Sequence, residues 1–294
     1  MSAAEAEPDW SSGPPPVEAE PYAIRTRDVG VQYALRFNRK KTVRQSVADF
    51  VSRRREERFW ALRHASIDLV QGESLGVIGP NGAGKSTFLQ VLAGILHPSE
   101  GVVDVRGQIS GLLTLGAGFD QELTGRENIL LAGAFLGLDS AVVSEILPRI
   151  IEFADLGDFI DAPIKVYSAG MRARLGFSIA TSVDPDILLL DEVLATGDAT
   201  FREKSKARVI ELVRAAKAVV LVTHDMSWVT EYCNRAILIE RGRITLEGNP
   251  EEVVELHRQH TAEEKARKLA ALSQSNLDPL VAERIERRAR RGRA

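Results

Sequence analysis

The sequence has almost no cysteine, because Cys233 is the only one among 294 residues. A disulfide framework and a metal site built from several cysteines are both excluded, and a reducing compartment is expected. Long hydrophobic runs are also missing: the longest apolar stretches, such as 187–190 and 218–222, are far shorter than the roughly 20 residues of a membrane-spanning helix. We therefore expect any role at a membrane to be peripheral.

A strong excess of one charge is absent as well. The formal net charge is −3, which gives no general case for a nucleic acid partner, and none is expected. Residues 1–21 lack the basic start and apolar run of a signal peptide and are rich in Pro, Ala, Glu and Ser, which predicts a disordered segment. Residues 261–294 are predicted to be a charged C-terminal tail, too short for another ordinary domain.

What the sequence does contain, over 22–260, is an alternation of short apolar runs and amphipathic helices. This pattern predicts one α/β domain around a mostly parallel sheet. Continuous apolar segments at 74–79, 186–191 and 218–223 predict buried strands, and 236–248 predicts an antiparallel hairpin that turns at Arg241 and Gly242. Residues 121–180 have a helical pattern, which predicts a helical subdomain inserted between strands of the sheet.

The segment GPNGAGKST follows the first of these strands and precedes an apolar helix. Glycines let backbone N–H groups surround phosphate oxygens, and the N-terminus of the next helix adds its positive dipole. Lys85 would reach the β and γ phosphates, and Ser86 would offer its hydroxyl to Mg²⁺. A chance glycine turn is the alternative. The predicted nucleotide-binding residues are Gly79, Pro80, Asn81, Gly82, Ala83, Gly84, Lys85, Ser86 and Thr87.

Two further strands end in polar side chains at the same expected edge of the sheet. After ILLL, Asp191 would hold Mg²⁺ through water and Glu192 would act as the base for an attacking water. Acidic residues that cap a following helix are the alternative. His224 follows the strand at 218–223 and would contact the γ-phosphate, with a purely structural histidine as the alternative.

The segment YSAGMRARLGFSIA, Tyr167–Ala180, is typical of a helix that Ser168 caps. Gly170 lies in the first turn, where a glycine costs helix stability. We therefore expect a ligand to approach the backbone there, and an unusual helix cap is the alternative.

In this order, GPNGAGKST, ELTGREN, YSAGMRARLGFSIA, ILLLDE and VTHD resemble the motifs of ABC transporter ATPase subunits, over residues 22 to about 255. The resemblance implies a P-loop NTPase cassette that uses ATP and Mg²⁺, with Lys85, Glu192 and His224 as catalytic residues. It also implies a homodimer, in which Ser168 and Gly170 of one subunit contact the ATP held by the other.

The combination of LGAGF, ELTGREN, YSAGMRARLGFSIA and DEVLATGD is similar to one branch of that family, which exports lipid-linked polysaccharides such as O-antigen, teichoic acid and galactan. This resemblance implies an ATPase at the cytoplasmic face of the membrane, which drives a lipid-linked glycan through a separate transmembrane permease. No dedicated carbohydrate-binding domain is expected in this chain. The rival interpretation is a non-transport ABC ATPase acting on DNA or ribosomes, and Glu192 disfavours a third, a regulatory switch without turnover.

Several positions depart from the family pattern or leave alternatives open. The usual Leu-Ser-Gly-Gly-Gln is replaced by residues 167–171, and no glutamine that would link Mg²⁺ to the permease is assigned near 115–117. Tyr33 would stack on adenine, with a structural strand tyrosine as the alternative. Residues 36–58 hold nine Lys or Arg against three acidic residues and include a predicted amphipathic helix near 43–51. That helix would contact anionic lipid or the permease, or present a solvated charged face.

Overall fold

A computed structural model describes residues 22–35, 57–111, 118–191 and 198–274. The strands form two sheets, an antiparallel one of order β2-β1-β4 and a six-stranded one of order β5-β6-β7-β3-β8-β9. In chain order the strands are β1 (Tyr22–Leu35), β2 (Glu57–Val70), β3 (Ser74–Ile78), β4 (Glu100–Val105), β5 (Ile109–Gly111), β6 (Ile187–Asp191), β7 (Ala218–Val222), β8 (Arg235–Glu240) and β9 (Arg243–Gly248).

The six-stranded sheet is parallel except for its last strand, so the predicted mostly parallel core with an antiparallel part is confirmed. Every residue of β7 is buried, as expected for a central strand that is covered on both faces and reads as a continuous apolar run. The hairpin of β8 and β9 is also confirmed. Its two turn residues, Arg241 and Gly242, have φ values of 50° and 77°, the left-handed conformations that a two-residue hairpin turn requires.

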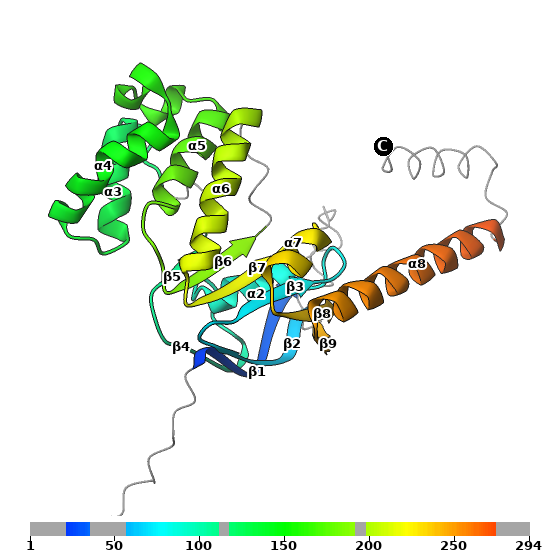
Figure 1. The fold of residues 1–294 in the computed structure, drawn as a ribbon. Helices are drawn as coiled ribbons and strands as arrows, with labels where there is room; N and C mark the ends of the chain where they lie inside the picture. Colours follow the sequence, from blue (N-terminus) through cyan, green and yellow to red (C-terminus); the bar gives the residue numbers. More distant parts are fainter. Residues whose placement is uncertain (1–21, 36–56, 112–117, 192–197, 275–294) are drawn as a thin grey trace, which may run out of the picture.

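Some helices pack directly on the sheets, and others form a separate group. In Figure 1, α3, α4 and α5 lie together on one side of the molecule with α6 beside them, while α2 lies within the body of the two sheets. Their bounds are α2 (Lys85–Leu92), α3 (Gly125–Phe135), α4 (Ser140–Ala154), α5 (Ala169–Ala180), α6 (Ala199–Ala215), α7 (Met226–Tyr232) and α8 (Pro250–Gln274), with short 3₁₀ helices at Gly157–Asp161 and Ile164–Val166.

Four apolar clusters of the described residues hold these layers together, and three of them involve the helices α2 to α6. The largest joins both sheets to α2 and includes Ile24, Leu62 and Phe88. A second packs α6 and α5 against the other face of the parallel sheet, and a third fills the space between α3, α4 and α5. Because α2 is enclosed between the two sheets, the loop that precedes it is held in a fixed place.

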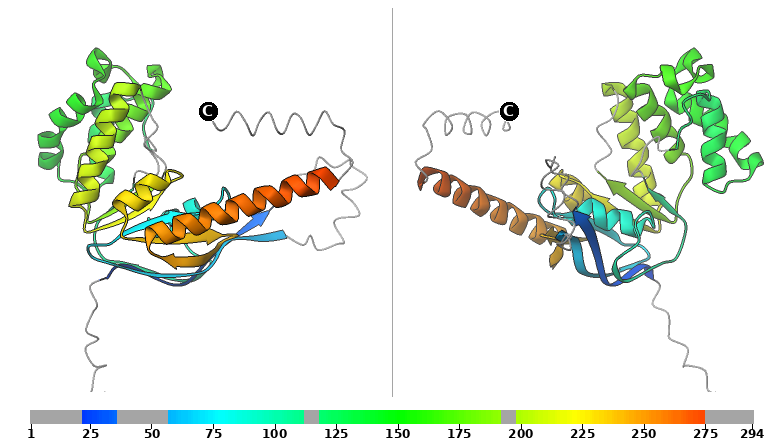
Figure 2. Two further views of the ribbon diagram at one scale, coloured as in Figure 1. Left: turned by 45° about the vertical axis from the view of Figure 1, so that its right-hand side comes forward. Right: turned by 180° about the vertical axis from the view of Figure 1, so that it is seen from behind.

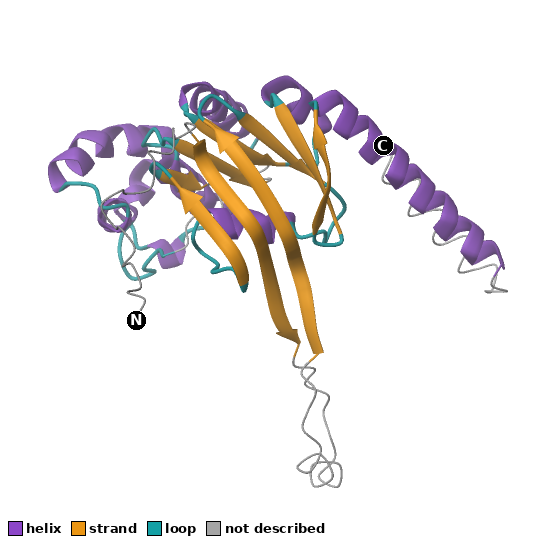
Figure 3. Ribbon diagram, turned by 90° about the horizontal axis from the view of Figure 1, so that it is seen from below, coloured by secondary structure: helices purple, strands orange, loops and turns teal. Residues whose placement is uncertain are grey.

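Two boundaries differ from those expected from the sequence. The helix α2 begins at Lys85, inside the GPNGAGKST segment, and α8 (Pro250–Gln274) continues past residue 261, where the charged tail was predicted to begin. Figures 1 and 2 show that α8 projects away from the body of the protein. Figure 3 shows the two long strands β1 and β2 extending past the rest of the antiparallel sheet.

Several predictions concern residues outside the described ranges. They include the disordered segment 1–21, the amphipathic helix near 43–51, the positions 115–117, the residue Glu192 and the tail after 274. Within the part of the chain that the structure describes, no helix is long and apolar enough to cross a bilayer.

Candidate functional site

The sheet order brings the ends of three strands together. β6, β7 and β3 are parallel neighbours, and the register aligns Asp191 with Val222 and Val222 with Val77. Asp191 therefore lies two strands, or about 10 Å, from the end of β3. The loop after β3 and His224, which follows β7, are at this same edge. The structure thus brings the GPNGAGKST segment, Asp191 and His224 to one edge of the sheet.

The loop after β3 has a backbone shape that depends on glycine. Gly84 has φ of 108°, a conformation that residues with a Cβ rarely adopt. A Cβ at this position would lie 2.4 Å from the backbone oxygen of Ala61 on β2. The hairpin turn supports the loop from another side, because the N–H of Gly242 donates to the oxygen of Ala83 at 2.9 Å. The loop is therefore fixed by backbone contacts from two directions.

The N-terminus of α2 differs from those of the other helices. No side chain caps it, whereas a side-chain oxygen accepts a hydrogen bond at the start of each helix from α3 to α7. Ser86, in the first turn of α2, is exposed. A helix N-terminus without a side-chain cap leaves backbone N–H groups to bind an anion. The caps of the other helices are Thr124, Asp139, Ser168, Asp198 and Asp225.

Lys85 is buried at the base of this loop, with 7% of its surface exposed. Its ammonium group donates to the backbone oxygens of Gly79 at 2.7 Å and Pro80 at 3.0 Å. These contacts hold the positive charge inside the loop. A cation at the base of a glycine loop and an uncapped helix N-terminus are the features from which phosphate-binding sites are built.

The edge beside the loop carries the other predicted groups. Asp191 is partly buried at the end of β6, and Glu192 lies outside the described residues. His224 is exposed, and the turn around it is fixed by Asp225, whose carboxylate accepts from the N–H of Ser227 at 3.0 Å. The hydrogen bond from the Ser227 hydroxyl is the largest cause that lowers the pKa of Asp225.

The N-terminus of α5 differs from that of α2, because a side chain caps it. Ser168 caps the helix, since its hydroxyl accepts from the N–H of Met171 at 3.2 Å. Ser168, Ala169 and Gly170 are all exposed. Among the residues that the structure describes, a Cβ on Gly170 would meet only the Ser168 hydroxyl, at 3.8 Å, so packing against them does not require a glycine there. In Figures 1 and 2, α5 belongs to the helical group, apart from α2.

Tyr33 lies on the strand pair that borders the loop. It is 40% exposed on β1 and pairs across to Phe59, another exposed aromatic residue on β2. Two residues after Phe59 on β2 is Ala61, whose backbone oxygen approaches Gly84. The structure therefore places Tyr33 on the strand pair next to the loop.

The reason for the tyrosine at position 167 was not apparent from the sequence. Its side chain is buried and its hydroxyl donates to the backbone oxygen of Phe159 at 2.5 Å. Burial raises the pKa of this hydroxyl. A Cβ on Gly125 would lie 2.3 Å from the Tyr167 oxygen, so the glycine of ELTGREN and the tyrosine of YSAG are packed as a pair. Neither motif reveals this contact alone.

The ELTGREN segment has a local signal that does follow from its spacing. Thr124 and Glu127 form a capping box at the start of α3, in which each side chain bonds the backbone N–H of the other. The buried Asn128 donates to the backbone oxygens of Asp120, Leu123 and Thr124. This segment is therefore an ordered start for α3.

Arg174 joins α5 to its neighbours. Its guanidinium donates to the backbone oxygens of Ala154 at 2.9 Å and Asp155 at 2.7 Å, at the C-terminal end of α4. It also lies 3.4 Å from the carboxylate of Asp198, the residue that caps α6. Because the Arg174 side chain connects α5 to the end of α4 and to the cap of α6, it fixes the position of α5.

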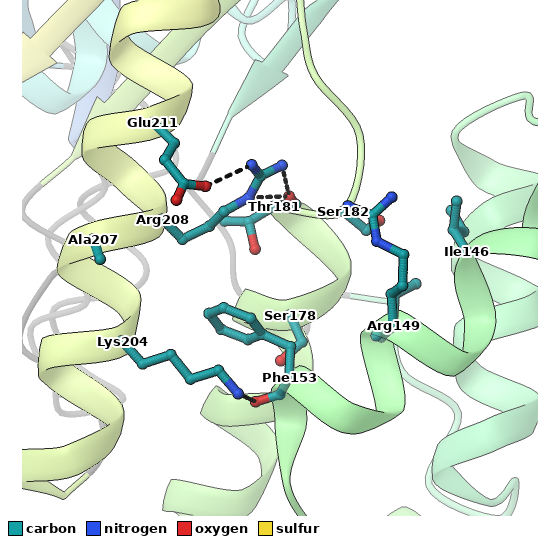
Figure 4. Close-up of a pocket in the computed structure, with 11 residues that line it drawn as sticks. Ile146, Arg149, Phe153, Ser178, Thr181, Ser182, Lys204, Ala207, Arg208 and Glu211 are labelled. Atoms are coloured by element: carbon teal, nitrogen blue, oxygen red, sulfur yellow. Dashed lines mark hydrogen bonds and ion pairs between the residues drawn. The ribbon is translucent and has the colours of Figure 1, made fainter.

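A cavity of about 320 Å³ lies between α4, α5 and α6, away from the predicted site residues (Figure 4). Two of its cations are already engaged: Lys204 contacts the backbone oxygens of Glu152 and Phe153 at 3.4 Å, and Arg208 donates to that of Thr181 at 2.8 Å. Cations at the C-terminal ends of helices stabilise them. We interpret this cavity as a junction between helices.

The sequence profile of the family described as "ABC transporter" matches residues 62–195. An O-antigen export system ATP-binding protein, RfbB, of Klebsiella pneumoniae is 44% identical over 205 residues, which cover 70% of this chain and 83% of that protein. RfbB of Myxococcus xanthus is 42% identical over 75% of this chain. A teichoic acids export ATP-binding protein, TagH, of Listeria monocytogenes is 44% identical over 67% of this chain. The chain spans only 53% of the M. xanthus protein and 58% of the L. monocytogenes protein.

Solved structures show the same fold. A dimeric ATP-binding cassette in a post-hydrolysis state, bound to ADP and Pi, aligns with 77% of this chain and 98% of its own length, with a TM-score of 0.59 and 21% identity. At this identity the likeness concerns the fold.

Proposed function

The chain belongs to the ABC transporter family, and on that premise we propose that it is the ATP-hydrolysing subunit of a transporter that exports a lipid-linked polysaccharide. The observation that carries the ATPase part is that the loop holding Lys85, the end of β6 with Asp191 and the end of β7 before His224 lie at one edge of the sheet. The names of the O-antigen and teichoic acid relatives support the polysaccharide as cargo. These relatives also favour export over the rival role on DNA or ribosomes.

In this proposal the triphosphate binds in the loop after β3. Lys85 offsets the charge of the β and γ phosphates, while the uncapped N–H groups of α2 bind their oxygens. Tyr33 stacks on the adenine. Because α2 and the loop are already fixed by the two sheets, little of the site must be ordered when the nucleotide arrives.

The same edge has the chemistry for Mg²⁺. The exposed hydroxyl of Ser86 and the carboxylate of Asp191 are hard oxygen donors, as this ion prefers. Bound there, Mg²⁺ would neutralise charge on the phosphates. Glu192 follows Asp191 directly, and we propose that it orients or deprotonates the attacking water, with His224 in contact with the γ-phosphate.

A second subunit completes the site in this proposal. Ser168 and Gly170 are exposed and unobstructed, so the start of α5 is available to contact a γ-phosphate held by another copy of the chain. The similar solved cassette is dimeric. Binding of ATP would close the dimer and hydrolysis would reopen it.

We further propose that the dimer acts at the cytoplasmic face of a membrane, on a separate permease that carries the glycan. The test is purification of the tagged chain from membranes of cells that contain its own export genes, followed by identification of the spanning protein that accompanies it. A permease should co-purify. Recovery of the chain with DNA or ribosomes and without a membrane protein would contradict the transport role.

The ATPase part is tested by two substitutions. Lys85→Ala should abolish ATP binding, because the phosphates lose their main cation, and Lys265→Ala, an exposed lysine on α8, is the matched control. Glu192→Gln should bind ATP and trap a dimer without turnover. Unchanged hydrolysis in Lys85→Ala would refute the phosphate site, and normal turnover in Glu192→Gln would remove that residue from the role of base.

A further inference from the structure

The first turns of α8 lie next to the segment 79–87, which we call the phosphate loop. These turns pack on β8, β9, β3 and α7. Val253 and Val254 are buried there, in a cluster with Leu238 of β8 and Ile78, the last residue of β3. The phosphate loop begins directly after Ile78. The side of α8 that faces the sheet is therefore close to the nucleotide site.

One turn further along the same side lies His257. Its ring is partly buried, and its Nδ1 atom is buried with no hydrogen-bond partner among the described residues. Charges on four elements act electrostatically on the ring: Glu240 at the end of β8, Lys85 of the phosphate loop, His224 after β7, and His260 on α8 itself. Three of these four groups are cations or become cations on protonation.

A chain of contacts also connects α8 to the loop through the hairpin. His260 Nδ1 lies 3.1 Å from a carboxylate oxygen of Glu240, whose other oxygen accepts from the Thr245 hydroxyl at 3.2 Å. Glu240 immediately precedes the turn that contains Gly242, and the Gly242 N–H donates to Ala83 in the loop. The base of α8 and the phosphate loop are thus parts of one connected structure.

We propose that His257 is a positioning residue of the nucleotide site, held on the sheet-facing side of α8 next to the phosphate loop, where its charge tunes the affinity for the bound phosphates. This inference rests on the proposed phosphate site. His257 is not placed in contact with the nucleotide, and it acts through the electrostatic field at the loop. The sequence motifs do not predict this role, because His257 belongs to none of them.

The sign of the effect follows from the charges. Burial is the largest cause that lowers the pKa of His257 below 6.5, and the positive charges of Lys85, His260 and His224 also lower it. Bound phosphate adds negative charge beside Lys85 and should raise this pKa. Since linkage is reciprocal, protonation of His257 should strengthen nucleotide binding. Affinity should therefore rise as pH falls through the pKa of the bound form, and level off below that of the free form.

The experiment measures the affinity of the full chain for ADP with Mg²⁺, by calorimetry, between about pH 8 and pH 5.5. ADP is used because it binds without turnover. From about pH 8 to about pH 5.5, the increase in ADP affinity of the wild type should be about five times the increase seen for His257→Asn. His260→Asn, one turn away on the same helix, is the matched control and should keep most of the gain. Ring NMR signals of His257 should titrate at a higher pH with ADP than without it.

The outcomes separate this inference from the function on which it rests. Wild-type protein that binds no ADP at about pH 8, where His257 is neutral, would refute the phosphate site itself. If ADP binds but His257→Asn keeps the wild-type pH profile, or the ring titrates alike with and without ADP, the role of His257 is overturned. Thermal unfolding of each variant shows that it is folded under the conditions used.

Discussion

The phosphate loop and the start of α5 both contain a glycine at a helix N-terminus, but the two glycines have different reasons. At Gly84 the chain's own backbone requires glycine, because φ is 108° and a Cβ would meet Ala61 at 2.4 Å. At Gly170 the nearest side-chain atom among the described residues, the Ser168 hydroxyl, would lie 3.8 Å from a Cβ. The first glycine is explained by the fold. For the second, the approach of another subunit is the explanation that we propose.

This difference divides the proposed ATP site into two halves. The loop half is supported by two sheets and by the Gly242 turn, so it is complete in one subunit. The α5 half is exposed, although Arg174 holds its support in place. Substitutions should therefore separate the halves: changes in the loop affect folding and binding by a single subunit, and changes at α5 affect only the step that needs two.

The largest effect on folding should come from Gly84→Ala. The side chain would enforce an unfavourable φ and collide with the backbone of β2, so we expect a loss of about 3 kcal/mol in the free energy of unfolding and no ADP binding. Urea denaturation and calorimetry measure both. Gly82→Ala is the control, because Gly82 also has a positive φ but an open environment, and it should lose only about 1 kcal/mol. Equal losses would show that the contact with Ala61 is unimportant.

The next effect concerns turnover. Ser168→Arg should reduce ATP hydrolysis at least about 100-fold, since a bulky cation would fill the space for the phosphate of the other subunit. Affinity of the single subunit for ADP should stay the same. Ser168→Ala isolates the loss of the helix cap, which costs about 1 kcal/mol of stability. A Ser168→Arg protein that hydrolyses ATP normally would assign Ser168 to capping alone.

A smaller effect is expected at Tyr167, the buried residue that directly precedes Ser168. Tyr167→Phe keeps the buried ring but removes the hydroxyl, and with it the hydrogen bond to Phe159 and the contact with Gly125, so stability should fall by about 1 kcal/mol. ADP affinity should not change, because the loop half is separate. Thermal unfolding and ADP titration are the measurements, and a loss of ADP binding would contradict the division into halves.

The smallest expected change in stability is at Gly170, and its sign is opposite. Gly170→Ala should stabilise the isolated subunit by about 0.5–1 kcal/mol, because alanine is the better helix former and the site has space for it. Hydrolysis should nevertheless decrease, since the added methyl group faces the partner. Stabilisation with unchanged hydrolysis would mean that no phosphate approaches this residue.

Much of the fold could be predicted from the sequence, because its signals are local. Continuous apolar runs indicated β6 and β7, and two turn residues indicated the hairpin of β8 and β9. The contact between Gly125 and Tyr167 could not be predicted, since it joins residues 42 positions apart whose types have other common explanations. The place of His257 could not be predicted either, since it depends on the packing of α8 against β8 and the end of β3. The start of α2 at Lys85 was missed because the glycine that precedes it replaces the usual side-chain cap.

The most direct test of the shared site is turnover by a mixture of two inactive proteins. Lys85→Ala subunits lack the loop half and Ser168→Arg subunits lack the α5 half, so a mixed dimer contains one site with both halves intact and one with both halves altered. If each ATP site is made from two subunits, the mixture should hydrolyse ATP although neither protein does so alone. A mixture as inactive as its components, under conditions where mixed dimers are shown to form, would contradict the shared site.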